Sequence, residues 1–164
     1  MKLKSEFLSE IQSRGFIYQA SDIEDLDVLI NQNKITAYIG FDITSDSLHI
    51  GSLLQLMLLH WLDYYNHNTI ALVGGGTTLV GDPSGKDETR KIIKIEKISK
   101  NLKKIEKTFG QFINLNAGGS IINNYEWLSN LNYIEFLRDI GSKLSLNKML
   151  TYESVKSRLD REQP

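Results

Sequence analysis

The sequence contains no cysteine, only two prolines and no long uninterrupted apolar run. The absence of cysteine excludes a disulfide framework, a thiolate nucleophile and a cysteine-ligated zinc site. No run of residues is long and apolar enough to span a bilayer, and Lys2, Lys4 and Glu6 interrupt the stretch where a signal peptide needs its apolar core. Together these absences predict a cytoplasmic protein that does not contact a membrane.

An excess of charge of either sign is also missing. The 164 residues include 19 basic and 20 acidic side chains, which give a formal net charge of −1. Any contact with nucleic acid would therefore come from a local basic patch. Hydrophobic residues make up 41% and charged residues 24% of the chain, a balance typical of one globular domain with a packed core.

The first part of the chain predicts two short helices and then a strand–helix–strand unit. Apolar residues lie on one helical face in each half of residues 1–33, which predicts an N-terminal helical segment. Residues 34–41 are rich in β-branched and aromatic side chains and predict a strand. Residues 51–65 are apolar on nearly every side, as in a buried crossover helix, and the apolar run 68–73 predicts a parallel strand covered on both faces. This order predicts a right-handed βαβ unit in an α/β fold.

The glycine-rich segment at residues 74–85 is the most unusual part of the second half of the chain. It holds five of the twelve glycines and indicates a loop that permits positive φ angles and close backbone approach, as a nucleotide or a substrate carboxylate needs. The other expected elements are a long amphipathic helix from residue 91 with a lysine-rich outer face, a turn at 116–120, a short strand at 121–125, a helix at 133–140 and one or two helices within 144–159.

The first candidate binding residues follow the first predicted strand. In an open parallel sheet, ligands bind beyond the carboxyl ends of the strands, where loops lead into helix N-termini. His49 and Ser52 share one face of such a first helical turn and can both donate hydrogen bonds to a phosphate. Gly51 lets a bulky ligand approach the backbone. The alternative is that His49 caps the helix.

A second group of candidates follows the second predicted strand. Asp82 can pair with a substrate ammonium group, and Lys86 and Arg90, four residues apart, can reach a polyphosphate together. The alternative for Asp82, which precedes a proline, is a simple turn residue. A phosphate-binding P-loop is excluded because Asp87 stands where Ser or Thr is required, and the dinucleotide fingerprint is excluded because Leu79 stands where the third glycine belongs.

Six blocks, in their order and spacing, carry a specific resemblance. They are residues 38–51 (YIGFDITSDSLHIG), 71–75 (ALVGG), 81–86 (GDPSGK), 123–127 (NNYEW), 136–141 (FLRDIG) and 154–158 (SVKSR). With these blocks the chain closely resembles bacterial-type tyrosyl-tRNA synthetases, which are class I aminoacyl-tRNA synthetases. The resemblance runs from about the first helix to the last residue.

The resemblance implies a fold and an activity. The implied fold is an α/β, Rossmann-like parallel sheet with helices on both faces, of which residues 34–164 would form the first half; the second half and the anticodon-binding domain would be absent. The implied activity is that of a tyrosine–tRNA ligase, in which the tyrosine carboxylate attacks the α-phosphate of ATP, pyrophosphate leaves, and the tyrosyl group passes to tRNA. We therefore expect an incomplete piece of this enzyme, which does not act alone.

The resemblance also implies roles for residues at matching positions. These are Tyr38 at the substrate phenol, Thr77 and Asp82 at its ammonium group and Asn124 in support; Gly40, Asp42, His49 and Gly51 at the nucleotide; and Thr44, His49, Ser52, Lys86 and Arg90 at the reacting phosphates. Ser52 departs from the family, which has a second histidine there. No metal site is implied, apart from Mg²⁺ as the counter-ion of ATP.

The implied partners are L-tyrosine, ATP, tRNA(Tyr) and a second copy of the chain. In the family, the segment that matches residues 133–149 contributes to a two-fold dimer interface. Phe136, Leu137, Ile140 and Leu144 would supply its apolar surface, although these residues fit an ordinary core equally well.

Two other functions stay open from the residues alone. A small nucleotidyltransferase also uses a histidine at a helix start in a short α/β domain, but it does not explain Tyr38 or the loop with Asp82. A non-catalytic RNA-binding module would use the lysines of the helix over 91–107, which otherwise form a solvated face. That module predicts salt-sensitive binding to any RNA.

Overall fold

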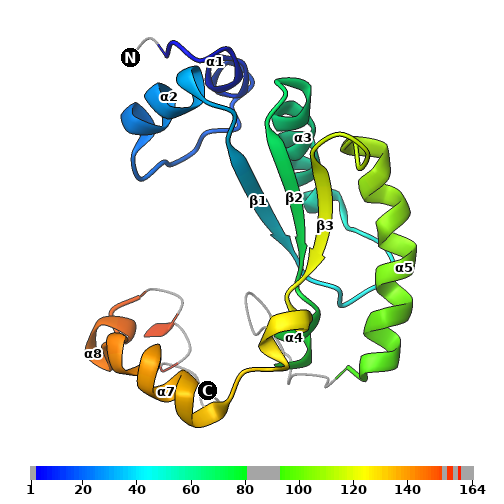
Figure 1. Ribbon diagram of the computed structural model, residues 1–164, viewed down its shortest axis with the longest axis vertical. Coiled ribbons are helices and arrows are strands. Elements are labelled where there is room, and N and C mark those ends of the chain that lie inside the picture. Colours follow the sequence, from blue (N-terminus) through cyan, green and yellow to red (C-terminus); the bar gives the residue numbers. More distant parts are fainter. Residues whose placement is uncertain (1–2, 81–92, 153–154, 157–158, 160–164) are drawn as a thin grey trace.

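A three-stranded parallel sheet forms the centre of the computed structural model, which describes residues 3–80, 93–152, 155–156 and 159. The strands are β1 (Thr36–Phe41), β2 (Asn68–Val73) and β3 (Gly119–Asn123), in the order β1-β2-β3 (Figure 1). The three predicted strands and the predicted parallel pairing are confirmed. The bounds of β2 are as predicted, and those of β1 and β3 differ from the prediction by no more than two residues.

The helices lie before, between and after these strands. They are α1 (Glu6–Ser13), α2 (Ile23–Gln32), α3 (Ile50–Tyr64), α4 (Gly75–Val80), α5 (Ile95–Phe112), α6 (Tyr125–Leu128), α7 (Tyr133–Asp139), a 3₁₀ turn (Gly141–Lys143) and α8 (Leu146–Met149). In α1, Gly15 has φ +75° and ends the helix as predicted. None of the described helices is both long and apolar enough to cross a membrane.

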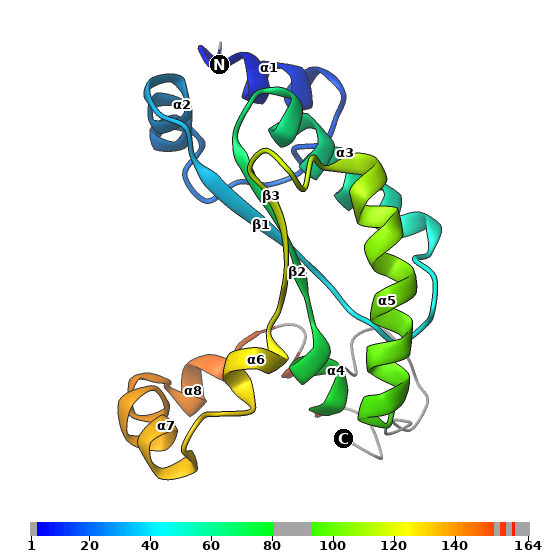
Figure 2. The same cartoon turned by 45° about the vertical axis from the view of Figure 1, so that its right-hand side comes forward.

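Both crossover helices cover the same face of the sheet. Helices α3 and α5 contact each other and lie on one side of the strands (Figure 2). Exposure in β2 therefore alternates: Thr69, Ala71 and Val73 are fully buried, whereas the residues between them are half-buried. In β1, Phe41 packs edge-to-face on Phe109 of α5 with ring centroids 4.9 Å apart. The apolar run of β2 predicted cover on both faces, but within the described residues helices pack on this one.

The N-terminal helices share the core of the sheet. Phe7 and Leu8 of α1 belong to the same hydrophobic cluster as Val73 of β2. The buried carboxylate of Asp27 in α2 accepts hydrogen bonds from the backbone N–H of Lys4, at 2.9 and 3.1 Å, and of Ser5, at 2.7 Å. These bonds attach the start of the chain to α2. A domain division between residues 33 and 34 stays a prediction.

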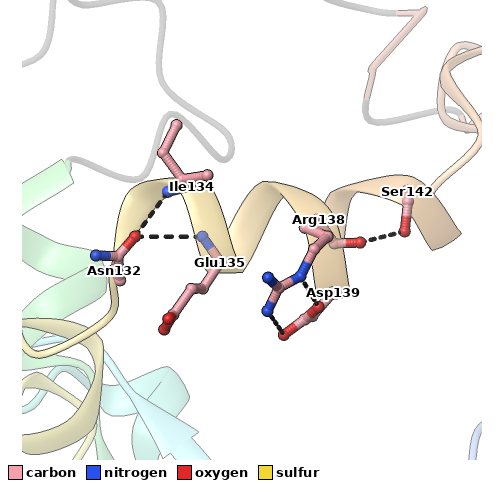
Figure 3. A network of polar contacts seen from close by, with 6 residues as sticks. All are labelled: Asn132, Ile134, Glu135, Arg138, Asp139 and Ser142. Carbon is pink, nitrogen blue, oxygen red and sulfur yellow. Dashed lines mark hydrogen bonds and ion pairs between the residues drawn. The ribbon is translucent and has the colours of Figure 1, made fainter.

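Helices α6, α7 and α8 bury none of their side chains among the described residues. Local contacts stabilise α7: the carboxamide oxygen of Asn132 accepts from the backbone N–H of Ile134 and Glu135, and Arg138 pairs with Asp139 (Figure 3). The apolar side chains of α7 stay exposed, including Phe136 at 37%, and Ile140 directly after the helix is 47% exposed.

Candidate functional site

The carboxyl ends of the three strands lie side by side and form the base of the candidate site. The backbone N–H of Gly74 donates to the carbonyl of Phe41 at 2.8 Å, and that of Asn124 donates to the carbonyl of Val73 at 2.9 Å. The residues that follow β1, β2 and β3 are thereby brought to one edge of the sheet, as the prediction from parallel topology requires.

Two asparagines at the end of β3 hold the N-terminus of α4. The carboxamide oxygen of Asn123 accepts from the backbone N–H of Gly75 at 3.2 Å, and that of Asn124 accepts from Gly76 at 2.8 Å. The amide nitrogen of Asn124 also donates to the hydroxyl of Thr77 at 3.3 Å. Because the first N–H groups of a helix have no partner within it, these oxygens satisfy donors that would otherwise be lost on burial. The predicted loop is therefore replaced by a short helix over 75–80.

The glycines of this segment are required by close approach. A Cβ atom on Gly75 would overlap the carboxamide of Asn123, and one on Gly74 would lie 2.6 Å from the hydroxyl oxygen of Thr77 and 3.0 Å from Oδ1 of Asp42. Among the described residues, the glycines with positive φ lie elsewhere in the chain. The prediction of close backbone approach is confirmed at Gly74 and Gly75, and Gly81 and Gly85 of this segment lie outside the described residues.

Tyr38 and Gly40 lie on the face of the sheet opposite α3 and α5. Tyr38 is opposite Ile70 in the register, and Gly40 is opposite Leu72. The side chain of Tyr38 is 67% exposed, and no described atom lies within 4 Å of the position that a Cβ on Gly40 would occupy. A planar ligand can therefore approach the strand backbone at Gly40 beside the phenol of Tyr38.

His49, Gly51 and Ser52 form a second group at the N-terminus of α3. His49 is the residue before the helix, and its side chain makes no capping hydrogen bond, which argues against the alternative of a simple cap. Its imidazole lies across Gly51, where a Cβ would be 2.9 Å from Cε1 of the ring. Ser52 is buried. The N–H groups of the first turn and the dipole of α3 favour an anion at this end.

The loop from residue 42 to 49 connects these two groups. Thr44 is exposed in it, directly after the buried Ile43. Farther along, the carboxylate of Asp46 accepts a hydrogen bond from Lys104 of α5 at 2.6 Å. This hydrogen bond and the charge of Lys104 lower the pKa of Asp46 below its ordinary value.

The structure thus brings Asp42, Thr77 and Asn124 together around the glycines and leaves His49 with Ser52 at the start of α3. The predicted site residues Asp82, Lys86 and Arg90 lie outside the described residues. Sequence reasoning missed Asn123, whose signal was its position at the end of a strand, next to another asparagine. Within the described part of the chain, no three His, Asp or Glu side chains gather to hold a metal ion.

Comparison with known proteins places this arrangement in a family. The curated relatives include proteins named tyrosine–tRNA ligase from Rhodospirillum rubrum, 51% identical over 164 residues, and from Rhodopseudomonas palustris, 54% identical over 163 residues; each alignment covers 98% of this chain and 39% of the relative. The chain thus spans about two fifths of the length of these relatives.

Solved structures agree in fold. A C-terminally truncated mitochondrial tyrosyl-tRNA synthetase from Aspergillus nidulans matches with a TM-score of 0.81 at 26% identity, over 98% of this chain and 49% of that one. The corresponding protein from Coccidioides posadasii matches with a TM-score of 0.75 at 30% identity, over 95% and 45%. The predicted Rossmann-like α/β class is confirmed. Residues 30–164 match the family described as tRNA synthetases class I (W and Y), and the chain belongs to this family.

Proposed function

We propose that the gene product carrying this sequence is a tyrosine–tRNA ligase that activates L-tyrosine with ATP and transfers the tyrosyl group to tRNA(Tyr). The observation that carries the proposal is sequence identity above 50% to proteins of that name along 98% of the chain. The arrangement of the strand ends supports it, because acceptors and donors from β1, α4 and the end of β3 converge there.

Tyrosine would bind along the open face of β1 and against α4. Tyr38 supports this with an exposed phenol that can exchange a hydrogen bond with the substrate phenol. Thr77 would accept from the substrate ammonium group, together with Asp82. Asn124 would keep the hydroxyl of Thr77 in place through the hydrogen bond between them. A site that pairs with a phenol rejects phenylalanine, because bound phenylalanine would cover the phenol of Tyr38 and leave it without a partner.

ATP would bind across the same strand ends. Gly40 would let the nucleotide lie against backbone, and Gly51 would line the nucleotide site together with the imidazole of His49 that lies across it. Asp42 would line the same site, and the N-terminus of α3 would attract the phosphates. The residues proposed for the phosphates are Thr44, His49, Ser52, Lys86 and Arg90.

In the first step, a carboxylate oxygen of tyrosine forms a bond to the α-phosphorus of ATP. The bond from that phosphorus to the oxygen bridging to the β-phosphate breaks, and pyrophosphate leaves with the electron pair. Negative charge builds up on the departing phosphates, so donors at Thr44 and His49 act by stabilising it. The carboxylate itself is the nucleophile, and the chain's part is to hold the two substrates in line.

The proposal includes the remaining partners. ATP would enter with Mg²⁺ as its counter-ion, and the protein would act in the cytoplasm. A second copy of the chain would cover the exposed apolar side chains of α7 and the segment after it, with Phe136, Leu137, Ile140 and Leu144 at 37–56% exposure. A surface of this kind favours association.

ATP–pyrophosphate exchange with the complete gene product tests the proposal. We expect exchange that depends on tyrosine, fails with phenylalanine and stops when Mg²⁺ is chelated. Tyr38→Phe should raise the KM for tyrosine and reduce the discrimination against phenylalanine. Exchange equally fast with both amino acids in the unaltered protein would refute the assignment of tyrosine, and transfer of a nucleotidyl group to a phosphorylated alcohol would favour a nucleotidyltransferase.

A further inference from the structure

The side chain of Ile43 anchors the loop that carries Thr44 and His49. It is 1% exposed, whereas the residues on either side of it are exposed. The loop therefore passes through the core at a single residue. The backbone N–H and carbonyl of Ile43 are buried away from solvent with it, so both groups need hydrogen-bond partners inside the protein.

Two buried polar side chains supply these partners. The hydroxyl oxygen of Thr78 in α4 accepts from the backbone N–H of Ile43 at 3.2 Å, and the amide nitrogen of Asn101 in α5 donates to the carbonyl of Ile43 at 3.4 Å. Thr78 and Asn101 are each 4% exposed. The loop is thus held from two different elements, 35 and 58 residues away in the sequence.

Asn101 occupies a position where an apolar residue is expected. It lies in the buried stripe of α5 with Ile98, Ile105 and Phe109. Asparagine is a poor helix former, and its carboxamide loses water on burial. An apolar residue at this position would pack without either cost, so the carboxamide is explained by its contact with the loop.

We propose that Thr78 and Asn101 are positioning residues that set the place of Thr44 in the site, an inference that rests on the function proposed above. The carbonyl of Ile43 and the N–H of Thr44 belong to one planar peptide group. A hydrogen bond that fixes this carbonyl therefore also fixes the direction in which the backbone enters Thr44. Reactions that depend on positioning are sensitive to such shifts, since a displacement of about 1 Å costs up to about 100-fold in rate.

The same loop and the same helix are joined a second time at the surface. Asp46 and Lys104 pair at 2.6 Å with side chains that are about half exposed. Exposed ion pairs contribute little to structure because water and salt screen them. This pair offers a control in which a contact between loop and α5 is lost without a buried group losing its partner.

The test uses the complete gene product and compares matched variants. Thr78→Val removes the hydroxyl and keeps the shape, Thr78→Ser keeps the hydroxyl, Asn101→Leu removes the donor at similar volume, and Lys104→Met breaks the surface pair. Each is measured for kcat/KM with respect to ATP in ATP–pyrophosphate exchange, for the Kd of tyrosine and for thermal unfolding. Asn101→Ser, which shortens the donor, replaces Asn101→Leu if the latter does not fold.

We expect Thr78→Val and Asn101→Leu to lower kcat/KM for ATP by about 10- to 100-fold, with the Kd of tyrosine within about twofold because Asn124 holds Thr77 separately. Thr78→Ser should restore most of the activity, and Lys104→Met should stay within about twofold of the unaltered protein. Equal losses in Thr78→Ser and Thr78→Val, or a loss of thermal stability with unchanged kcat/KM, would overturn the inference. Absence of tyrosine-dependent exchange in the unaltered protein would instead refute the proposed function, and the inference with it.

Discussion

Alanine at Gly75 and alanine at Gly40 should have opposite consequences, although both glycines lie at the carboxyl edge of the sheet. A Cβ at Gly75 would overlap the carboxamide of Asn123 and force it away. That carboxamide oxygen accepts from Gly75 and, at 3.1 Å, from Tyr125. Each such bond contributes about 0.5–1.5 kcal/mol, so their loss costs about 1–3 kcal/mol. The stiffer unfolded chain with alanine returns about 0.4–1 kcal/mol. The midpoints of these two ranges give a fall in the free energy of unfolding of about 1.3 kcal/mol.

In Gly40→Ala, the new Cβ would have no described atom within 4 Å, so the substitution changes stability only through the unfolded chain. The free energy of unfolding should stay the same or rise by up to about 1 kcal/mol. The new methyl group would, however, project into the space proposed for ATP. We therefore expect a raised KM for ATP in pyrophosphate exchange, with the KM for tyrosine changed less.

Urea unfolding of the 164-residue chain and exchange with the complete gene product measure the two effects separately. The double variant Gly75→Ala, Asn123→Ala checks the cause, because the second substitution removes the atoms that the first one meets. The cost of the pair should then be less than the sum of the two single costs. The reasoning would be refuted if Gly75→Ala were as stable as the unaltered chain while Gly40→Ala was destabilised.

Three further predictions concern the rest of the chain. Asp27→Ala should lower the free energy of unfolding by about 2–4 kcal/mol, since three short contacts to backbone N–H groups are lost at a buried carboxylate; urea titration measures it, and a change below about 0.5 kcal/mol would contradict it. Burial, and next the charge of Lys34, lower the pKa of His67 below its ordinary value of 6.5. The unfolded chain therefore takes up a proton before the folded one as the pH falls below 6.5, and stability should decline there, with a flatter profile in His67→Gln. Phe136→Asp should convert the proposed dimer of the complete gene product to monomer in analytical ultracentrifugation, and an unchanged mass would count against an interface at α7.

Patterns that depend on neighbouring residues predicted the fold well. The run over 68–73 predicted β2 with its bounds, because β-branched and apolar side chains favour a strand wherever one covered face receives them. Gly15 predicted the end of α1, because few other residues adopt a positive φ angle. The same run also predicted helices on both faces of β2, and among the described residues helices pack on one face. Composition records how apolar a strand is, but not which helices pack on it.

The glycine segment shows what local patterns miss. Glycine lowers helix propensity, so residues 74–80 predicted a loop. Asn123 and Asn124, 48 residues away, accept hydrogen bonds from the first N–H groups of α4 and so favour this helix. Part of its stability therefore comes from the end of β3, which local reasoning treats separately.

The contacts that hold the loops of the candidate site each join a side chain to a backbone group, and such contacts are hard to recognise in a sequence. Asn123 and Asn124 accept from backbone N–H groups of glycines, Thr78 accepts from the backbone of Ile43, and Asn101 donates to its carbonyl. Every residue except proline offers the same two backbone groups, so the type of the residue that is held does not indicate that its backbone makes such a contact. The residues proposed to meet the ligands are different, because a phenol, an imidazole or a glycine has a chemistry of its own that stands out in the chain. A sequence therefore indicates candidates for contact with a substrate earlier than it indicates the side chains that hold them. The asparagine in the buried stripe of α5 is the local signal that the contact with Ile43 leaves.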